Sequence, residues 1–259
     1  MAKDSIKTSK QITQAGGDVR FAQAYLNRYG YLAQRRYNAG VIDESTKLGI
    51  AQFQRFFCLK VTGKLEDSTL RAMTIARCGL PDPAARARYV AQCPWTAALP
   101  IHFTFKGGST SISDDDALAA VMRAISTWSP VDVPNVPKFE KVDPDKSPDL
   151  LITWLKADPD LGFASTTYAH SDFPPACPVI NKNPPPTPLH FNDNDMSWTN
   201  NPVPGLADVE SVALHELGHV LGLGHSAVAG AVMFPALELG NSLRTLSADD
   251  HEGLLSLYP

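Results

Sequence analysis

The stretch HELGHVLGLGH, residues 215–225, constrains the fold of this chain more than any other segment. It holds three of the chain's seven histidines, His215, His219 and His225. Residues four apart on a helix project from the same face, so His215 and His219 can reach one metal ion. Gly222 suits a sharp turn after such a helix, which would bring His225 back as a third ligand. Three protein ligands leave the fourth position of zinc open, as is typical of catalytic rather than structural zinc.

Two further residues strengthen this interpretation. Glu216 is adjacent to the first histidine and could take a proton from a metal-bound water without being a ligand itself. Met233, in AVMFP, follows shortly downstream, where a tight turn could place its thioether beneath the ligands. The alternative is an ordinary helix that carries surface histidines, which the shorter HExxH pattern alone would not exclude. The longer pattern with Gly222 and His225 in register favours a zinc hydrolase.

Composition narrows the classes of function. The chain has 259 residues, of which 44% are hydrophobic and 19% charged, as in a soluble globular protein. A net charge of -4 without a Lys/Arg block argues against a nucleic-acid partner. No apolar run approaches the roughly 18 residues needed to span a bilayer. The opening MAKDSIKTSKQI lacks the apolar core of a signal peptide, so we expect an intracellular chain or a sequence trimmed of such a segment.

The sequence predicts two units joined by a linker. Residues 15–76 read as three helices, the first beginning at the Gly-Gly-Asp of residues 16–18 and the third near Asp67. Residues 78–100, rich in Pro, Ala and Arg, mark the boundary. Residues 158–204 are rich in Pro and Asn, and we expect little regular structure there; bound metal ions would explain so long an irregular segment in a compact domain. The other expected elements are strands in IHFTF, PKFEKV and DLLITWL, a helix from Asp114, and helices over 208–221 and 247–257.

The four cysteines have different contexts. Cys58 follows two phenylalanines and is most simply a buried apolar thiol. Cys78 lies among turn-forming residues, where no core residue is expected. Cys93 and Cys177 both neighbour prolines in loop-like segments and could pair, although a disulfide is much less favoured in the cytosol. The sequence leaves that pairing open.

These motifs resemble a known family. HELGHVLGLGHS with the Met-turn AVMFP resembles the metzincins, and specifically the matrix metalloproteinases, or matrixins. ARCGLPD, residues 76–82, resembles the matrixin cysteine switch PRCGxPD, with Ala76 where the family has proline. Residues 15–76 resemble the peptidoglycan-binding-like fold of matrixin prodomains, and PDLLITW, HFNDNDMSW and LSADDHEGLLSLYP also fall where matrixin counterparts would. The resemblance covers nearly the whole chain and includes no hemopexin-like repeat or fibronectin insert, as in a minimal zymogen.

The resemblance implies an α+β fold and a latent enzyme. A three-helix prodomain with the switch would span residues 1–83, a linker or activation region 84–96, and a catalytic domain 97–259 with a twisted, mostly parallel sheet and helices. In the zymogen the thiolate of Cys78 would fill the fourth zinc position until the linker is cut. Arg77 and Asp82 would form a salt bridge that holds the switch loop.

A second metal site is implied, with departures from the family pattern. Matrixins bind a structural zinc with three histidines and an aspartate, and bind calcium nearby. His170 and His190 match two histidines and Asp160 the aspartate, while Asp158 stands at the other histidine position. The site could keep zinc, lose it, or favour calcium. Among the positions of the family's calcium ligands, Asp195 keeps an acid while Asn192 replaces one. The simpler alternative for the second metal site is that His170 and His190 are ordinary loop residues.

The expected activity is that of a zinc metalloendopeptidase acting on proteins or peptides after an activating protease has cut the linker. Ser211 and Leu237 would border an open apolar pocket that prefers a large apolar residue after the scissile bond. Leu239 and Leu243 would add to its apolar wall, and Arg244 could reach its far end. We expect a monomer without nucleic-acid or membrane-spanning partners, secreted by family resemblance. One alternative is a cell-wall glycan-binding module, residues 15–76, attached to a zinc peptidase, but such a module has no use for the Cys78 loop. A catalytically dead metal-binding scaffold is disfavoured by Glu216.

Overall fold

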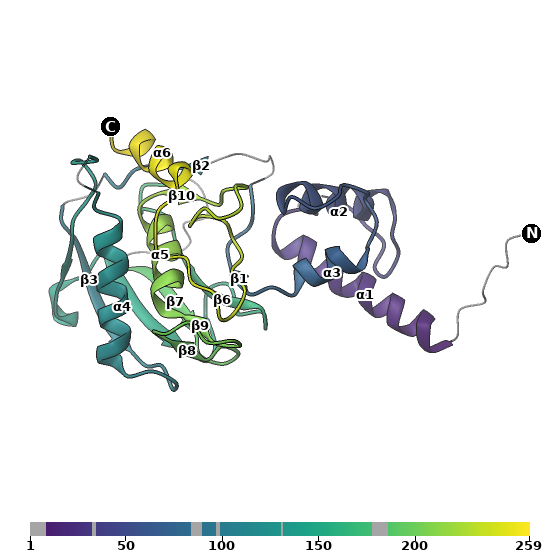
Figure 1. The fold of residues 1–259 in the computed structure, drawn as a ribbon, viewed down its shortest axis with the longest axis horizontal. Helices are drawn as coiled ribbons and strands as arrows, with labels where there is room; N and C mark the ends of the chain where they lie inside the picture. The colour runs from purple at the N-terminus through teal and green to yellow at the C-terminus, as the bar shows by residue number, and fades with distance from the viewer. Residues whose placement is uncertain (1–8, 33–34, 84–89, 97–98, 131, 178–185) are drawn as a thin grey trace, which may run out of the picture. The chain divides into compact units, whose positions relative to one another are not determined.

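The computed structural model describes residues 9–32, 35–83, 90–96, 99–130, 132–177 and 186–259, with side chains described from residue 17 onward (Figure 1). The chain separates into two compact units. The first ends at Thr74, and the second comprises Ile75–Pro83 together with the chain from Ala87 to Pro259. The switch segment around Cys78 therefore packs with the second unit. Of the expected linker 84–96, residues 84–89 lie outside the described residues.

The first unit contains three helices, as the sequence predicts: α1 (Ser9–Arg28), α2 (Glu44–Phe56) and α3 (Asp67–Met73). Their buried aromatic residues form its core; Phe53, for example, packs edge-on against Tyr25 and Tyr31. The expected start of the first helix was wrong, because the helix begins at Ser9 and the glycine pair lies inside it. Glycine disfavours a helix interior by only about 1 kcal/mol, too little to end a helix here.

The second unit is built on a six-stranded sheet with the order β1-β6-β7-β5-β3-β4. All neighbouring strands run parallel except β6 and β7. The sequence predicts β5, whose burial alternates along LLITWL as expected for a sheet with two different faces. The strands are β1 (Arg77–Cys78), β3 (Ile101–Gly107), β4 (Phe139–Lys141), β5 (Leu150–Leu155), β6 (Thr167–Ser171) and β7 (Thr187–Asn192).

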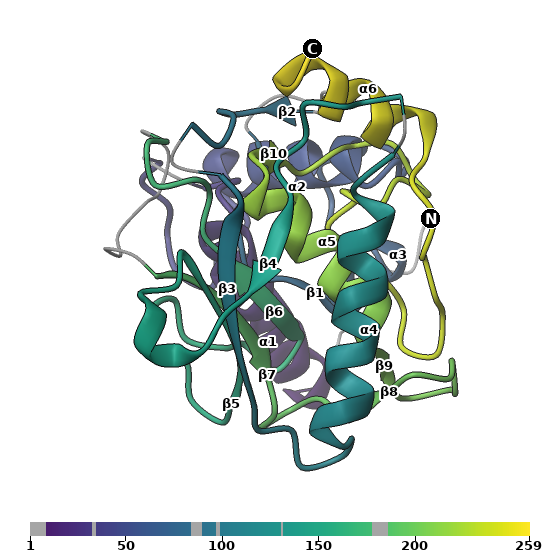
Figure 2. The same cartoon turned by 90° about the vertical axis from the view of Figure 1, so that its left-hand side faces the viewer.

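Two helices cover one face of this sheet (Figure 2). They are α4 (Asp114–Thr127) and α5 (Val209–Val220), and the Trp128 indole nitrogen after α4 donates a hydrogen bond to the Leu214 carbonyl of α5 at 2.7 Å. The third helix, α6 (Ala248–Leu257), begins with a capping box formed by Ser247 and Asp250. The remaining elements are β2 (Val90–Ala91), η1 (Pro144–Lys146), β8 (Trp198–Thr199), β9 (Ala207–Asp208) and β10 (Leu223–Gly224).

Three expectations for these segments are corrected. Residues 158–204 are not poor in regular structure, because β6 and β7 are fully buried strands within them. Their histidine, threonine and asparagine side chains hide the apolar pattern that normally marks a strand. Cys58 is exposed rather than buried, because its backbone has a φ of 55° in the turn that ends α2. Cys78, by contrast, is fully buried.

Cys93 and Cys177, whose pairing the sequence leaves open, form a disulfide. It links the segment after β2 to the loop after β6. The same segment pairs with β10 in an antiparallel ladder, and the amide of Gln92 donates to the Gly222 carbonyl at 2.9 Å. Residues 90–93 are therefore held against the turn that follows α5.

Candidate active site

The three histidines of residues 215–225 lie close together at the end of α5. The helix ends at Val220, and Gly222 adopts a φ of 101°, which glycine tolerates better than other residues. The turn brings His225 to within 5.3 Å of His215 and 4.9 Å of His219, measured between ring centroids. One ring nitrogen from each histidine and the Cys78 sulfur all lie within 4.8 Å of one another.

The hydrogen bonds of these rings show which nitrogen is free to bind a metal. The Nδ1 atoms of His215 and His219 lie 2.7 and 2.6 Å from the carbonyl oxygens of Val232 and Leu223. A carbonyl oxygen only accepts, so each Nδ1 carries the proton and each Nε2 a lone pair. The two Nε2 atoms face one another at 3.1 Å.

His225 completes the same arrangement. Its Nδ1 lies 2.9 Å from Asp82 Oδ1, while its buried Nε2 has no hydrogen-bond partner among the described residues. Three converging lone pairs repel one another unless a cation lies between them. Burial also lowers the pKa of all three imidazoles, that of His215 to about 3, so the rings are neutral. The donor set fits zinc.

Met233 packs beneath the helix at the level of the ligands. A Cβ added to Gly218 would lie 2.3 Å from the Met233 sulfur, so only glycine permits this close approach. The carboxylate of Asp250, at the start of α6, accepts hydrogen bonds from the amides of Val232 and Met233 at 2.8 and 2.9 Å. This carboxylate fixes the turn that also supplies the Val232 carbonyl to His215. From the sequence, Asp250 is expected only as an acid in the first turn of the helix over 247–257.

Cys78 sits directly at the histidine cluster. Its Sγ is 3.5 Å from His219 Nε2. The backbone of the switch segment forms a strand between β6 and residues 235–237: Arg77 pairs with Thr167 in parallel and with Ala236 in antiparallel orientation. Burial raises the pKa of the thiol well above its usual value, but a divalent cation at the cluster would reverse this and favour the thiolate.

A buried ion pair holds the switch segment. The Arg77 guanidinium binds the Asp82 carboxylate with two hydrogen bonds, of 3.0 and 2.7 Å, and both side chains are inaccessible to solvent. Burial tends to raise the pKa of Asp82, but Arg77 and His225 together bring it well below its ordinary value. Asp82 stays ionised and also orients the His225 ring. The salt bridge implied by the family resemblance is present.

Glu216 is fully buried beside the cluster. Ser171 of β6 contacts it twice: its Oγ lies 2.8 Å from the Glu216 carbonyl oxygen and 3.1 Å from Oε2. The other oxygen, Oε1, has no hydrogen-bond partner in the part of the chain that the structure describes. Burial raises the pKa of Glu216 to about 8, and the Cys78 thiol and the hydrogen bonds from Ser171 offset only part of this.

The residues proposed for a second metal also come together. Asp158, Asp160, His170 and His190 each offer one ligand atom, and these atoms lie within 4.8 Å of one another. Asp158 Oδ1 lies 3.0 Å from His170 Nε2 and 2.9 Å from His190 Nδ1. The fully buried His170 ring has no hydrogen bond of acceptable geometry at either nitrogen. Asp195 lies elsewhere, 3.2 Å from the Asn192 amide nitrogen.

A hollow of about 500 Å³ lies beside the segment that pairs with the switch. Leu237 and Leu243 line it, together with Pro202, Gly230, Ala231, Phe234, Ala236, Gly240, Asn241 and Ser242. Ser211 is not among its lining residues, because its hydroxyl is buried and hydrogen-bonded to Asp208 and to the Leu243 amide. Leu239 points outward, and Arg244 pairs with Asp208.

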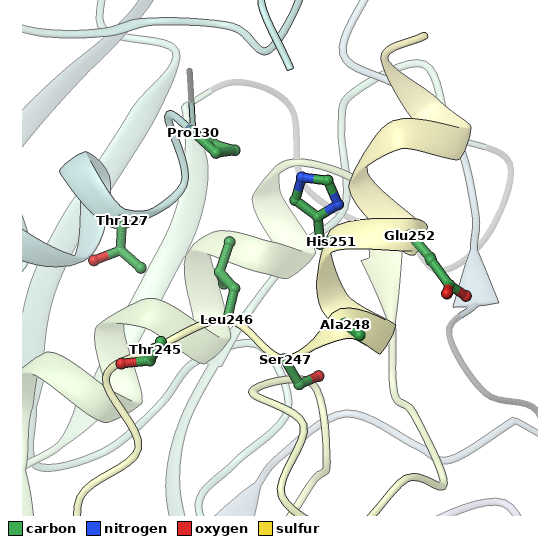
Figure 3. Close-up of a pocket in the computed structure, with 8 residues that line it drawn as sticks. All are labelled: Thr127, Pro130, Thr245, Leu246, Ser247, Ala248, His251 and Glu252. Atoms are coloured by element: carbon green, nitrogen blue, oxygen red, sulfur yellow. The ribbon is translucent and has the colours of Figure 1, made fainter. Parts of the chain in front are cut away.

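Another hollow, of about 480 Å³, lies between the end of α4 and the start of α6 (Figure 3). Thr127 and Pro130 line one side, and residues 245–248 with His251 line the other. None of the three clustered histidines lines this hollow or the one beside the switch segment. The His251 ring is already paired with Asp132 at 2.9 Å, so this hollow offers no free imidazole among its lining residues.

Comparison with known proteins agrees with this geometry. Residues 94–259 match the sequence profile of the matrixin family, and residues 15–73 match that of peptidoglycan-binding domains. The chain is 30% identical over 260 residues to metalloendoproteinase 5-MMP of Arabidopsis thaliana, across 90% of this chain and 69% of that protein. It is 32% identical over 255 residues to the interstitial collagenase of Sus scrofa, across 93% of this chain but only 49% of the collagenase. This chain therefore spans about half the length of that relative.

Proposed function

The chain belongs to the matrixin family of zinc metalloendopeptidases, and from that premise we propose that His215, His219 and His225 hold its catalytic zinc and that Glu216 is the general base. The observation that carries this proposal is the convergence of three histidine Nε2 atoms beside a buried glutamate. When bound, zinc would supply a Lewis acid that polarises the scissile carbonyl and lowers the pKa of a water.

The protein's own residues do the remaining work. The carbonyls of Val232 and Leu223 and the Asp82 carboxylate fix the three rings so that each presents Nε2. Glu216 takes a proton from the attacking water at Oε1 and delivers it to the leaving amine, so no covalent intermediate with the protein forms. Ser171 holds the other carboxylate oxygen in place.

One experiment tests this function. The full chain, activated with a thiol-reactive mercurial, is assayed for zinc content and for cleavage of a quenched peptide library. We expect hydrolysis that a chelator abolishes and added zinc restores, with cleavage mainly before Leu, Met or Phe. We expect this preference because the large apolar side chains of Leu237 and Leu243 line the hollow. An activated protein that binds zinc but cleaves no peptide would refute the proposal.

We also propose that the intact chain is latent. The Cys78 sulfur lies with the three histidine nitrogens and would fill the fourth position of a bound zinc, and the Arg77–Asp82 pair keeps the segment there. Residues 1–83 then act as the prodomain with its switch, 84–96 as the activation region, and 97–259 as the catalytic domain, although residues 75–83 pack with the last. The Cys93–Cys177 disulfide limits where the activating protease can cut. A cut after Cys93 would leave the prodomain covalently attached, so the productive cut precedes Cys93.

The second cluster is proposed as a structural metal site with the donor set Asp158, Asp160, His170 and His190. Two carboxylates and two imidazoles suit zinc, and the close approach of the four ligand atoms supports a cation there. Calcium binding at Asp195 remains a weaker proposal, since that carboxylate instead contacts the Asn192 amide.

We propose a secreted monomer that acts on extracellular proteins or peptides after an activating protease has cut the linker. The disulfide supports an oxidising compartment. In the described part of the chain, no helix combines the length and apolar character that crossing a membrane requires.

The match of residues 15–73 to peptidoglycan-binding domains favours a second candidate function, attachment to cell-wall glycan. Sedimentation of the full chain with purified peptidoglycan distinguishes glycan attachment from a role as prodomain alone. Retention on peptidoglycan would support glycan attachment, and a protein that stays in solution but is latent would support the prodomain role alone.

A further inference from the structure

The loop between Met233 and α6 forms the outer wall of the hollow beside the switch segment. Leu237 and Leu243 are among the residues that line it. The Leu237 amide donates to the Ala76 carbonyl at 3.0 Å, and two further hydrogen bonds hold the loop farther along the chain. The Gly240 amide donates to the Leu206 carbonyl at 2.8 Å, and the Leu243 amide donates to Ser211 Oγ at 2.7 Å.

One buried carboxylate orients the hydrogen bond between Leu243 and Ser211. Asp208 caps α5: its Oδ2 accepts hydrogen bonds from the Ser211 amide at 3.0 Å and from the Ser211 hydroxyl at 2.5 Å. The hydroxyl proton is thus directed to Asp208, which leaves the Ser211 oxygen free to accept from the Leu243 amide. The position of Leu243 depends on the orientation that Asp208 imposes on Ser211.

The residue after Leu243 binds the same carboxylate. Arg244 donates from Nε to Asp208 Oδ2 at 3.0 Å and from Nη2 to Oδ1 at 2.5 Å, the paired geometry that arginine makes with a carboxylate. Nη2 also donates to the Asn200 carbonyl at 2.6 Å. The Asp208 side chain is fully buried, while that of Arg244 is 31% exposed. Arg244 therefore fixes the end of the loop to the start of the helix that carries His215.

We propose that Arg244 is a positioning residue for substrate selection: its pairing with Asp208 holds Leu243 in place and thereby sets the depth of the hollow that receives the side chain after the scissile bond. The inference rests on the proposed function in one respect, the assignment of this hollow to that side chain. Arg244 lines neither the hollow nor the histidine cluster. It acts through Asp208, Ser211 and the backbone of its own loop.

Arg123 offers a matched control on the other side of the same helix. Its Nε lies 2.5 Å from Glu210 Oε2, so it also pairs with an acid in the first turn of α5. Nη1 of Arg244 lies 3.6 Å from the same Glu210 oxygen, but among the contacts of the described residues Arg123 touches neither Asp208 nor the loop. Replacing Arg123 therefore removes a cation from this helix end while the pair of Arg244 with Asp208 stays in place.

The test compares Arg244→Ala, Arg244→Lys and Arg123→Ala in the full chain, activated with a mercurial. Two peptides differ only in the residue after the cut, leucine in one and biphenylalanine in the other. We expect Arg244→Ala to raise the ratio of kcat/KM for the long side chain over leucine about ten-fold, mainly through KM. Lysine keeps the charge but not the paired geometry, so Arg244→Lys should shift the ratio part of the way. Arg123→Ala should leave the ratio at the parent value.

Hydrogen exchange at the Leu243 amide gives a readout that does not depend on turnover. We expect faster exchange in Arg244→Ala and parent-like exchange in Arg123→Ala. If the parent cleaves neither peptide, the proposed function is refuted, and the role of Arg244 in substrate selection is refuted with it. If the parent cleaves both peptides but Arg244→Ala leaves the kcat/KM ratio or the exchange of the Leu243 amide unchanged, only the role of Arg244 is overturned.

Discussion

The sulfur of Cys78 lies 3.5 Å from Nε2 of His219, although the two residues are 141 positions apart in the chain. The contact is made by backbone pairing rather than by the thiol alone. The Cys78 amide donates to the Pro235 carbonyl at 2.9 Å, and the Gly79 amide donates to the Ala169 carbonyl at 2.8 Å. The segment thus lies between β6 and residues 235–237 as an added strand.

Replacing this thiol should remove latency. A hydroxyl is a poor zinc ligand, so Cys78→Ser should cleave peptides without a mercurial or a protease and should process its own linker. The measurement is the rate of hydrolysis by freshly purified protein. Cys58→Ser is the matched control, because that thiol is exposed in the helical unit and its loss should leave latency intact. Equal latency of Cys78→Ser and the parent would show that the thiol does not block the site.

Replacing the buried glutamate should separate metal binding from catalysis. Glu216→Ala should keep the zinc content of the parent, because its carboxylate is not needed as a ligand. Hydrolysis should fall by about 10²–10⁴-fold, the usual contribution of a positioned general base. His219→Ala serves as the contrast, since it should lose zinc together with activity. Substantial activity in Glu216→Ala would refute the assigned role.

The sequence predicted the site better than the scaffold that orients it. The spacing of His215, His219 and His225 predicted that their side chains lie together, as they do, and α5 was predicted to within one residue at each end. Periodicity could not identify β6 and β7, because both of their faces are buried and polar groups such as His170 and His190 lie in them. Nor could it show that Asp250 and Ser171 orient the site, since those contacts depend on the folding of segments far apart in the chain.

The disulfide predicts how the activated protein behaves on a gel. A protease cut before Cys93 should release the prodomain without a reducing agent. A cut engineered after Trp95 should yield two fragments that separate only under reducing conditions, because Cys93 remains bonded to Cys177. Cys93→Ser combined with Cys177→Ser should release the prodomain in both cases. Separation of the fragments from the Trp95 cut without reductant would contradict the disulfide.

The buried hydroxyl of Tyr258, close to the end of the chain, should make the stability of the second unit depend on pH in the alkaline range. The Tyr258 hydroxyl donates to the Leu221 carbonyl at 2.7 Å and accepts from the Trp95 amide at 2.8 Å. Burial raises the pKa of Tyr258 to about 12, although the hydrogen bond from Trp95 lowers it in part. A pKa raised by folding means that the stabilisation is complete below the unfolded pKa of about 10 and is lost as the pH rises to about 12.

Denaturant unfolding of the zymogen between pH 8 and 12, followed by tryptophan fluorescence, measures this effect. The parent should lose on the order of 2 kcal/mol of its free energy of unfolding through this group across pH 10–12. Tyr258→Phe should be about 1 kcal/mol less stable at pH 8, through the lost hydrogen bonds, but should lose less stability in the alkaline range. Tyr37→Phe in the helical unit is the control. Parallel pH profiles for the parent and Tyr258→Phe would show that this hydroxyl does not titrate as expected.

Asp158 decides whether the second cluster binds a metal. Its Oδ1 lies between two imidazoles, 3.0 Å from His170 Nε2 and 2.9 Å from His190 Nδ1. Either it shares a cation with them, or it accepts their protons in a metal-free network. Asp158→Asn keeps the shape and removes the charge, so we expect metal analysis to fall from two zinc ions per chain to one, with peptide hydrolysis by the remaining catalytic zinc retained. Asp160 is 19% exposed and lies 3.3 Å from His190 alone, so Asp160→Asn should weaken the second ion less. A parent that binds one zinc, and an Asp158→Asn variant that binds the same amount, would establish the metal-free network instead.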